Sequence, residues 1–401
     1  MLTSSTGGGH DMRARAFKAW AESRQAEHLG LEVVILQTLE STSSFYNFGV
    51  WLYNWIQRVW PRLHHVYFNI LEGLNLHRRA RRILGADAFQ EIVREVAPRV
   101  VISTHAHLNH GFFELARAAL PEQSPACVTY CGELYYTYGF SRHWVNPRAN
   151  LFIGAVEDTC TAARKRGMAE DRIWCGGFLM KPAFYKPRLL PQDRERFIRE
   201  ELRMDPNRFI LVLATGANGA NNHVRFLRRL DQAGVRPQVV ALCGRDPRTL
   251  RAVANWAADH PQFEIQALHF YGEVHQLLQC ASAVVARPGT GTTSEAILCG
   301  CPIIFNIIGG AMPQELITMR FFRRRYQWPR PVGRASSLPN RVRLWMDHPD
   351  QYARARRQMI QSIPRETPLA ILQRVAALAA LEGEADRSPV STPASTPDSA
   401  A

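Results

Sequence analysis

Short runs of apolar residues recur along the chain, and longer amphipathic segments separate them. In the first half these runs lie at 31–36, 100–104, 126–130 and 151–154. In the second half they lie at 209–213, 238–242, 282–286 and 302–305. Helical patterns such as 13–26 and 112–119 stand between them. Uninterrupted apolar strands that alternate with helices are typical of parallel sheets covered on both faces, so the pattern predicts an α/β protein with two Rossmann-like domains.

Length and local composition divide this pattern into domains. A chain of 401 residues is too long for one compact core and fits two. The pattern predicts a first domain at 1–180 and a second at 207–335, joined by a linker at 181–206 that is rich in Pro, Arg and Lys. Helices are expected at 336–384, and residues 385–401, mostly Ser, Thr, Pro and Ala, are expected to be disordered.

The chain is strongly basic, and its formal net charge of +14 should draw it toward polyanions. Nucleic acid, an anionic membrane surface and nucleotide diphosphates all satisfy this, and charge alone does not choose between them. No apolar run reaches the about 18 residues of a membrane-spanning helix, and the start lacks the pattern of a signal peptide. The eight cysteines are scattered without the paired spacing of a zinc site, so we expect buried, reduced thiols and no metal site.

The segment 287–296, Arg-Pro-Gly-Thr-Gly-Thr-Thr-Ser-Glu-Ala, has the composition of a phosphate-binding loop. It follows an expected strand and opens an expected helix, where free backbone N–H groups and the helix dipole favour an anion. Four of its residues would supply donors to a diphosphate: Gly289, Thr290, Gly291 and Thr292. Glu295, about one turn into the helix, would hydrogen-bond both hydroxyls of a ribose. The simpler alternative is a helix-capping segment in which Thr is the cap and Glu favours the helix dipole.

Three further strand ends carry polar or glycine-rich loops, at the edge where ligands bind in such sheets. The loop after the first strand of the second half contains Gly216 and Asn218, and the next strand ends at Gly244 and Arg245. Gln314 and Glu315 follow the strand at 302–305, and an amide beside a carboxylate suits the hydroxyls of a sugar. A plain turn, a helix cap and the start of a surface helix are the respective alternatives.

The chain opens with a glycine turn, Thr6-Gly7-Gly8-Gly9-His10, between a short strand and a helix. Gly8 and Gly9 allow a sharp turn and the close approach of an acceptor ligand. His10 lies at the start of the helix, where its imidazole can take a proton from an acceptor hydroxyl near neutral pH. Glu133, after another strand end, is a second candidate base on the acceptor side. The alternative is a glycine-rich turn with an incidental histidine.

The segment 45–68 is dense in aromatic residues, and arginines flank it. Trp51 and Trp55, with Arg58 and Arg62 close behind, have the composition of an interfacial helix. In such a helix the rings lie at the level of the lipid headgroups and the arginines meet lipid phosphates. The alternatives are a buried aromatic core helix and a surface on which nucleic-acid bases stack.

Together these motifs resemble the galactosyl- and glucosyl-diacylglycerol synthases of bacteria and plants and, more distantly, the lipid-linked N-acetylglucosaminyltransferase of peptidoglycan synthesis. The resemblance covers roughly residues 1–380 and also includes 176–178, 243–245 and 271–273. It implies a GT-B fold, in which two Rossmann-like domains face each other across a cleft, and an inverting reaction that needs no metal and no cofactor. It further implies that Glu295 binds the uridine ribose of the donor.

The resemblance also implies roles for other residues, and the chain departs from it at two of them. Gln314 and Glu315 would bind the sugar, and His10 would lie where acceptor and donor meet. Plant members carry an aspartate, the proposed base, two positions before the first glycine, where this chain has Ser5, so we assign the base to His10. The lysine usual before the glycine motif is Arg287 here, and arginine can hold a phosphate with two hydrogen bonds.

The chain is thus predicted to be an inverting glycosyltransferase that moves a hexose from a UDP-sugar to diacylglycerol or a related membrane lipid. Its partners would be the UDP-sugar, the lipid acceptor and an anionic membrane surface, with no nucleic acid, and it would act as a monomer or homodimer. It is expected in the cytoplasm, peripheral on the inner face of the cell membrane. The alternatives are a glycosyltransferase for a polyprenyl or soluble acceptor, a UDP-sugar epimerase of the same fold, and a non-catalytic nucleotide- or lipid-binding protein.

Overall fold

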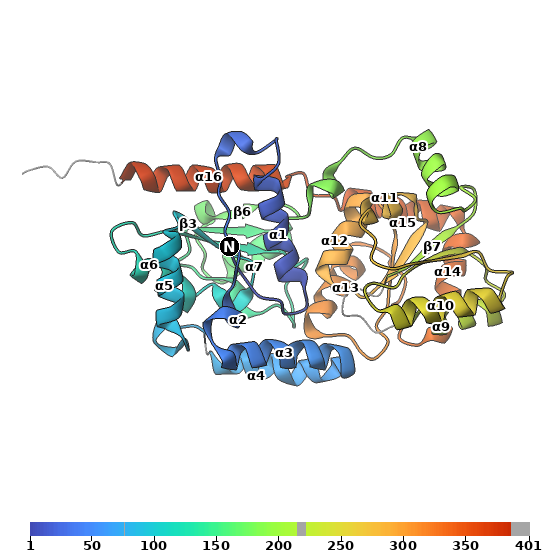
Figure 1. The fold of residues 1–401 in the computed structure, drawn as a ribbon, viewed down its shortest axis with the longest axis horizontal. Coiled ribbons are helices and arrows are strands. Elements are labelled where there is room, and N and C mark those ends of the chain that lie inside the picture. The colour runs from blue at the N-terminus through green and yellow to red at the C-terminus, as the bar shows by residue number, and fades with distance from the viewer. Residues whose placement is uncertain (76, 215–221, 386–401) are drawn as a thin grey trace, which may run out of the picture.

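The computed structural model describes residues 1–75, 77–214 and 222–385. These residues form two domains that lie side by side, each a parallel sheet with helices on both faces (Figure 1). This arrangement confirms the predicted α/β architecture of two Rossmann-like domains. Gly216 and Asn218 of the predicted donor loop lie outside the described residues.

The first domain is built on a six-stranded parallel sheet with the strand order β2-β1-β3-β4-β5-β6. The strands are β1 (Leu2–Thr3), β2 (Leu36–Gln37), β3 (Val100–Ser103), β4 (Ala126–Cys131), β5 (Leu151–Gly154) and β6 (Ile173–Cys175). The helices are α1 (Gly9–Ala21), α2 (Thr38–Thr42), α3 (Ser44–Val59), α4 (His64–Leu74), α5 (Ala86–Val96), α6 (Gly111–Ala119) and α7 (Glu157–Lys165). The last helix, α16 (Pro368–Ala385), returns to this domain and packs Ile371 and Leu372 beside Phe17 of α1.

The second domain has a five-stranded parallel sheet with the order β11-β10-β7-β8-β9. Its strands are β7 (Ile210–Ala214), β8 (Gln238–Leu242), β9 (Ile265–Leu268), β10 (Ala283–Ala286) and β11 (Ile303–Phe305). Its helices are α9 (His223–Gln232), α10 (Pro247–Asp259), α11 (Val274–Cys280), α12 (Thr290–Cys299), α13 (Pro313–Arg325), α14 (Leu338–Met346) and α15 (Pro349–Gln361).

The strands are mostly apolar because helices cover both faces of each sheet. In β7, Ile210 and Val212 pack under the layer formed by α11, α12, α13 and α15. Leu211 and Leu213 pack under the layer formed by α9, α10 and α14. Successive side chains of a strand point to opposite faces, so a strand that is buried on both sides favours apolar residues, and a buried polar one such as Gln238 is hydrogen-bonded.

Three features differ from the pattern that the sequence predicts. The strand expected at 31–36 begins only at Leu36. The edge strands β6 and β9 are not predicted, because β6 is only three residues long and Gln266 interrupts the apolar run of β9. The segment 181–206 carries α8 (Pro191–Arg196) and buries Ile198 and Leu202 in the core of the second domain, so most of it folds with that domain.

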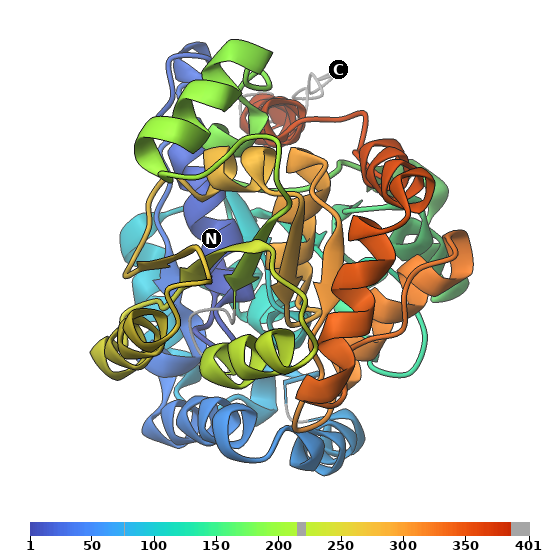
Figure 2. The same cartoon turned by 90° about the vertical axis from the view of Figure 1, so that its right-hand side faces the viewer.

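The α3–α4 pair lies along the lower edge of the molecule in both views of the fold (Figures 1 and 2). The start of α4 reaches the second domain, since His65 Nε2 is 2.9 Å from the carbonyl oxygen of Ala311. The other ring nitrogen of His65, Nδ1, is 3.0 Å from the hydroxyl of Tyr138 in the first domain. The pair therefore connects the two domains along this edge. Within the described ranges, no helix has the length and apolar character needed to cross a membrane.

Candidate active site

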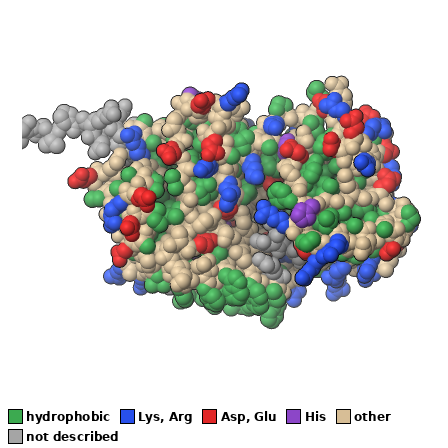
Figure 3. All heavy atoms as spheres, viewed as in Figure 1, with side chains coloured by type: hydrophobic (Ala, Val, Ile, Leu, Met, Phe, Trp, Pro, Cys, Tyr) green, Lys and Arg blue, Asp and Glu red, His purple; other side chains and the backbone are tan. Residues whose placement is uncertain are grey.

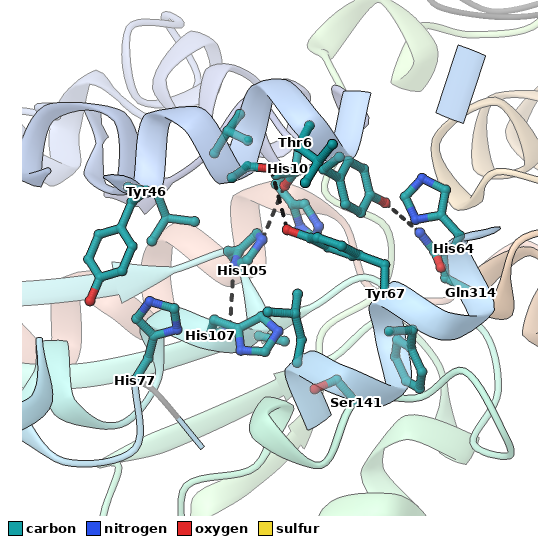
Figure 4. A pocket seen from close by; sticks show the side chains of 18 of the residues that line it. Thr6, His10, Tyr46, His64, Tyr67, His77, His105, His107, Ser141 and Gln314 are labelled. Carbon is teal, nitrogen blue, oxygen red and sulfur yellow. Dashed lines mark hydrogen bonds between the residues drawn. The ribbon is translucent and has the colours of Figure 1, made fainter. Parts of the chain in front are cut away.

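A cavity of about 310 Å³ lies between the α3–α4 pair and the carboxyl ends of the first sheet (Figure 4). Its wall on the helix side is apolar and includes Phe45, Phe48, Leu52, Phe68, Leu71 and Leu74. Its other end carries polar groups, namely Thr6, His10, His105, Glu133 and Gln314. A mostly apolar pocket with a few convergent polar groups is the usual form of a small-molecule site. The cavity thus joins an apolar chamber to groups that can accept or donate protons.

His10 lies at the start of α1, at the polar end of the cavity, beside the ring of His105 (Figure 4). Its Nδ1 is 2.6 Å from the carbonyl oxygen of Thr104. Because a carbonyl oxygen only accepts hydrogen bonds, Nδ1 carries the proton and Nε2 is the basic nitrogen. Burial and the charge of Arg13 lower the pKa of His10 to about 4, so the ring is neutral at pH 7. His10 can therefore take a proton through Nε2.

Glu133 follows β4 and is buried at the cavity wall. Burial raises the pKa of its carboxyl to about 7, and the Arg13 guanidinium opposes the shift. Its Oε2 atom has no hydrogen-bond partner among the described residues. A carboxyl group that is partly protonated near neutral pH can exchange a proton with a ligand, so Glu133 is a physically sound second candidate for the base.

The carboxylate of Glu40, which the sequence motifs do not indicate, lies beside Ser5. Glu40 on α2 accepts three hydrogen bonds at Oε1, from the Ser5 backbone N at 2.7 Å, Ser5 Oγ at 2.8 Å and Ser4 Oγ at 3.1 Å. The position where plant members of the resembled family carry an aspartate therefore has a carboxylate next to it. The parallel pairing of β1 with β2 brings these two segments together, which the spacing in the sequence does not reveal.

Arg13 on α1 contacts both domains. The sequence motifs do not point to this residue. Its Nη2 donates to the carbonyl oxygen of Gly132 at 3.0 Å and to Thr290 Oγ1 at 2.5 Å. A Cβ atom on Gly132 would lie 2.1 Å from the Arg13 Nε, so a side chain at this position would displace the guanidinium from these contacts. Arg13 thus places the helix that carries His10 against the first turn of α12, the predicted diphosphate site.

The inward face of α3 contacts both the glycine turn and the second domain. Asn54 Oδ1 accepts a hydrogen bond from the Gly7 backbone N at 3.0 Å, and Asn54 Nδ2 donates to the carbonyl oxygen of Ser5 at 3.4 Å. The hydroxyl of Tyr53 accepts a hydrogen bond from Gln314 Nε2 at 2.5 Å, so Gln314 reaches the cavity from the second domain (Figure 4). One helix therefore holds the turn before His10 and the residue predicted to bind the sugar.

The predicted diphosphate loop forms the start of α12. Gly289 is the N-cap, and residues 290–292 make the first turn. The first N–H groups of a helix have no acceptor within it, so they are available to an anion. Glu295 lies one turn further on, where burial raises the pKa of its carboxyl to about 7 against the opposing charge of Lys181. Gly291 lies against Met12 of α1, so the loop also borders the first domain.

The other predicted donor residues lie at neighbouring strand ends of the second sheet. Gly244 and Arg245 follow β8, and the Arg245 guanidinium is 5.1 Å from the ring centroid of Phe270. Parallel strands end at the same edge, so these residues share that edge with the start of α12. Their contact with a nucleotide stays a prediction.

Arg287 and Glu315 are paired with each other. Arg287 Nε is 2.7 Å from Glu315 Oε1, Nη2 is 2.5 Å from Oε2, and both side chains are largely buried. Arg287 also donates to the carbonyl oxygens of Ile308 and Gly310. The pair therefore holds the loop before α13 and sets the position of the adjacent Gln314. A phosphate contact for Arg287 and a sugar contact for Glu315 stay predictions.

The outer face of α3 and α4 is apolar and exposed. Trp51 and Trp55 on α3 are 57% and 44% exposed, and Trp60 after it is 61% exposed. Val66 and Ile70 on α4 are each more than half exposed. Figure 3 shows hydrophobic side chains gathered along the lower edge, where Figure 1 places these helices. Such exposure excludes a buried core helix, one of the alternatives for this segment.

Of the two arginines predicted to meet lipid phosphates, only Arg62 has a described side chain. Arg62 lies at the turn between α3 and α4 and is exposed. Its stem packs against the second domain, since a Cβ atom on Gly310 would be 2.5 Å from its Cγ. The side chain of Arg58 lies outside the described part of α3.

Histidines are concentrated around the cavity in the first domain. The group consists of His10, His64, His77, His105, His107, His110 and His143. Several rings touch in sequence, with centroid distances of 4.5 Å for His10–His105, 5.7 Å for His105–His107 and 4.8 Å for His107–His143. Burial lowers every pKa in the group: to about 3 for His143, to about 4 for His10, His64, His77 and His110, and well below the ordinary value for His105 and His107.

We expect these histidines to make the protein unstable in mild acid. Because their pKa values are lower in the folded chain, the unfolded chain binds more protons below about pH 6.5, and stability falls from there. Glu133 and Glu295, whose pKa values are raised to about 7, act in the opposite direction but are fewer. The free energy of unfolding in urea should fall steeply between about pH 6.5 and about pH 5, by up to about 1.4 kcal/mol per pH unit for each histidine in excess of the two carboxyl groups. An unchanged value would contradict the buried, neutral state of the cluster.

In sequence, the chain is similar to proteins that are named as glycosyltransferases of glycolipid synthesis. No family model matches it. Over 326 residues it is 24% identical to a probable monogalactosyldiacylglycerol synthase of Glycine max, and the match covers 76% of this chain and 57% of that protein. It is 20% identical over 161 residues, 40% of each protein, to a processive diacylglycerol beta-glucosyltransferase of Bacillus pumilus. The chain thus spans 57% of the length of the first of these relatives.

Solved structures identify the fold. MurG of Acinetobacter baumannii superposes with a TM-score of 0.59 at 11% identity, covering 94% of this chain and 98% of that one. UGT89C1 of Arabidopsis thaliana, solved with quercetin, superposes with a TM-score of 0.56 at 11% identity and the same coverage of both chains. The chain therefore has the GT-B fold, and it is a sequence relative of the monogalactosyldiacylglycerol synthases, as its motifs predicted.

Proposed function

We propose that the protein transfers a hexose from a UDP-sugar to diacylglycerol or a related membrane lipid, with inversion at the sugar C1. One observation carries this proposal: the helices that line the apolar end of the cavity are the same helices whose outer face is apolar and exposed. A lipid that enters from a membrane under α3 and α4 would keep its chain among apolar residues and bring its hydroxyl to His10. The relatives named for diacylglycerol glycosylation support this class of acceptor.

The reaction would be a single displacement. His10 Nε2 takes the proton of the acceptor hydroxyl, and the oxygen attacks C1 of the sugar. The bond between C1 and the phosphate oxygen breaks, and its electron pair leaves with UDP. One displacement inverts C1. The N–H groups at the start of α12 would stabilise the charge that develops on the leaving diphosphate.

Replacing Glu295 with Ala should weaken UDP binding by about a hundredfold or more. The variant loses two hydrogen bonds to a charged group, each of which contributes roughly 1.5–3 kcal/mol. Isothermal titration with UDP measures the effect directly. Glu264→Ala, which removes an exposed carboxylate of the same domain, is the matched control and should bind UDP normally. Equal UDP affinity in the two variants would show that Glu295 does not bind the ribose.

We propose that the protein binds an anionic membrane peripherally, through α3 and α4, on the inner face of the cell membrane. The exposed tryptophans would lie among the headgroups, and the net charge of +14 favours an anionic surface. This arrangement places the cavity directly over the lipid. Either a monomer or a homodimer is compatible with it.

The proposed activity is tested by a substrate screen. UDP-glucose, UDP-galactose and UDP-N-acetylglucosamine are each incubated with the protein and a membrane lipid extract, and the products are identified by mass spectrometry. A hexosyl-diacylglycerol with inverted configuration is the expected product. A product on a polyprenyl or soluble acceptor, or conversion of a UDP-sugar without any acceptor, would replace the proposal with one of the alternative functions.

A further inference from the structure

Two cysteines that are distant in the sequence meet a carboxylate at the far edge of the first sheet. Glu157 and Cys160 lie on α7, and Cys175 is the last residue of β6. Their candidate ligand atoms, one carboxylate oxygen and two sulfurs, all lie within 4.8 Å of one another. Among the residues that the structure describes, no other three His, Cys, Asp or Glu side chains meet this closely.

The cluster is built on a helix and two paired strands, and their backbone leaves room for the sulfurs. Glu157 and Cys160 are three positions apart on α7, so they share one face of the helix. Cys175 pairs in register with Gly154 of β5. A Cβ atom on Gly154 would lie 2.7 Å from Cys160 Sγ, so the absence of a side chain there is what lets the thiol sit over the strand.

The three residues differ in exposure, so the cluster is partly buried but open to solvent on one side. Cys160 is fully buried, Cys175 is half-buried, and the side chain of Glu157 is 62% exposed, which leaves a path from solvent. Glu157 contacts Arg164, but Arg164 also holds Glu170 with two hydrogen bonds of 2.7 and 2.9 Å. Exposed ion pairs of this kind contribute little, so Glu157 can turn to a cation while Arg164 keeps a partner.

We propose that Glu157, Cys160 and Cys175 bind one thiophilic divalent cation of the Zn²⁺ class, with water in the fourth position. Two thiolates and one carboxylate are ligands that Zn²⁺ takes in tetrahedral sites. Both thiols give up their protons to solvent on binding, and no electrons are transferred. The site is separate from the cavity that holds His10 and does not depend on the proposed transferase activity.

The cation would fix the point where the chain leaves the first domain. Cys175 directly precedes Gly176 and Gly177, and a Cβ atom on Gly177 would lie 2.7 Å from the carbonyl oxygen of Glu366 on the returning strand of chain. The chain passes between the domains after Cys175 and returns near Glu366, and these two segments are in contact next to the site. A metal bridge from α7 to Cys175 would stiffen the first crossing and stabilise the folded chain, since it binds only when these elements are together.

Competition with a chromogenic Zn²⁺ chelator tests the proposal on the reduced full-length chain. We expect one Zn²⁺ per chain, release of protons into a weak buffer with an indicator dye, and a rise in melting temperature. Cys160→Ser and Cys175→Ser should each weaken binding at least about tenfold, and Glu157→Gln, an exposed change that keeps the fold, should weaken it measurably. Cys243→Ser, which removes a buried thiol elsewhere, should bind as the unchanged chain does.

Three results would overturn the assignment. If the unchanged chain binds no more Zn²⁺ than the Cys160→Ser variant, there is no site. Equal affinity in Glu157→Gln would remove the carboxylate from the ligand set. A mass two hydrogens lower under non-reducing conditions, lost in the Cys175→Ser variant, would show that the two thiols form a disulfide in place of a metal site.

Discussion

Replacing His10 with Ala should slow glycosyl transfer by about 10²- to 10⁴-fold, the usual contribution of a general base, and leave UDP affinity unchanged. The structure supports this because the Thr104 carbonyl holds the proton on Nδ1 and makes Nε2 the basic atom at the polar end of the cavity. The rate with saturating UDP-sugar and lipid gives the loss, and titration with UDP shows that the donor site is intact. A rate within a factor of a few of the original would exclude His10 as the base.

The pH dependence separates His10 from its competitors. With a pKa of about 4, His10 stays unprotonated above about pH 5, so kcat/KM should be flat from there to about pH 8. Glu133, with a pKa of about 7, would instead give a tenfold loss for each pH unit below about 7. Glu133→Gln and Glu40→Gln are the matched variants. If either of them loses more activity than His10→Ala, that carboxylate is the base.

Replacing Trp51, Trp55 and Trp60 with Ser should lower the affinity for anionic vesicles by more than about a hundredfold. Full burial of a large apolar side chain contributes about 1.5–3 kcal/mol, so three partly inserted rings at about 1 kcal/mol each account for about 3 kcal/mol. None of the three lines the cavity, and all are exposed in the folded chain. Vesicle flotation measures binding, while the melting temperature and the activity on a detergent-dispersed acceptor should stay close to the original.

The control for this experiment removes exposed apolar residues away from α3 and α4. Leu190 and Ile360 are 57% and 42% exposed and lie on the segment before α8 and on α15. The double variant Leu190→Ser, Ile360→Ser should float with vesicles as the unchanged chain does. Flotation by the tryptophan variant as well would contradict the proposed membrane face, and loss of flotation by the control would show that the effect is not specific to it.

The sequence by itself determined the architecture and the helix start at 289–295, where a donor site is predicted. A continuous apolar run such as 239–242 has to be covered on both faces of a sheet. In a parallel sheet, the loop that follows such a strand lies at the edge where ligands bind. The start of α12, with Gly289 as N-cap and Glu295 one turn later, is local in the chain, so residue spacing was enough to predict it. The edge strand β6 was not predicted, because a run of three apolar residues is too short to indicate a strand.

Only the tertiary structure decided which groups face one another. The pairing of β1 with β2 puts Glu40 beside Ser5, and the packing of α1 on the second domain brings Arg13 to Thr290. The same packing decides the tautomer of His10 through Thr104. These contacts join residues that are tens to hundreds of positions apart, and no local pattern encodes them, because they depend on how whole elements stack. Local spacing therefore specifies loops and helix starts, whereas the protonation and neighbours of the candidate base follow from the assembled fold.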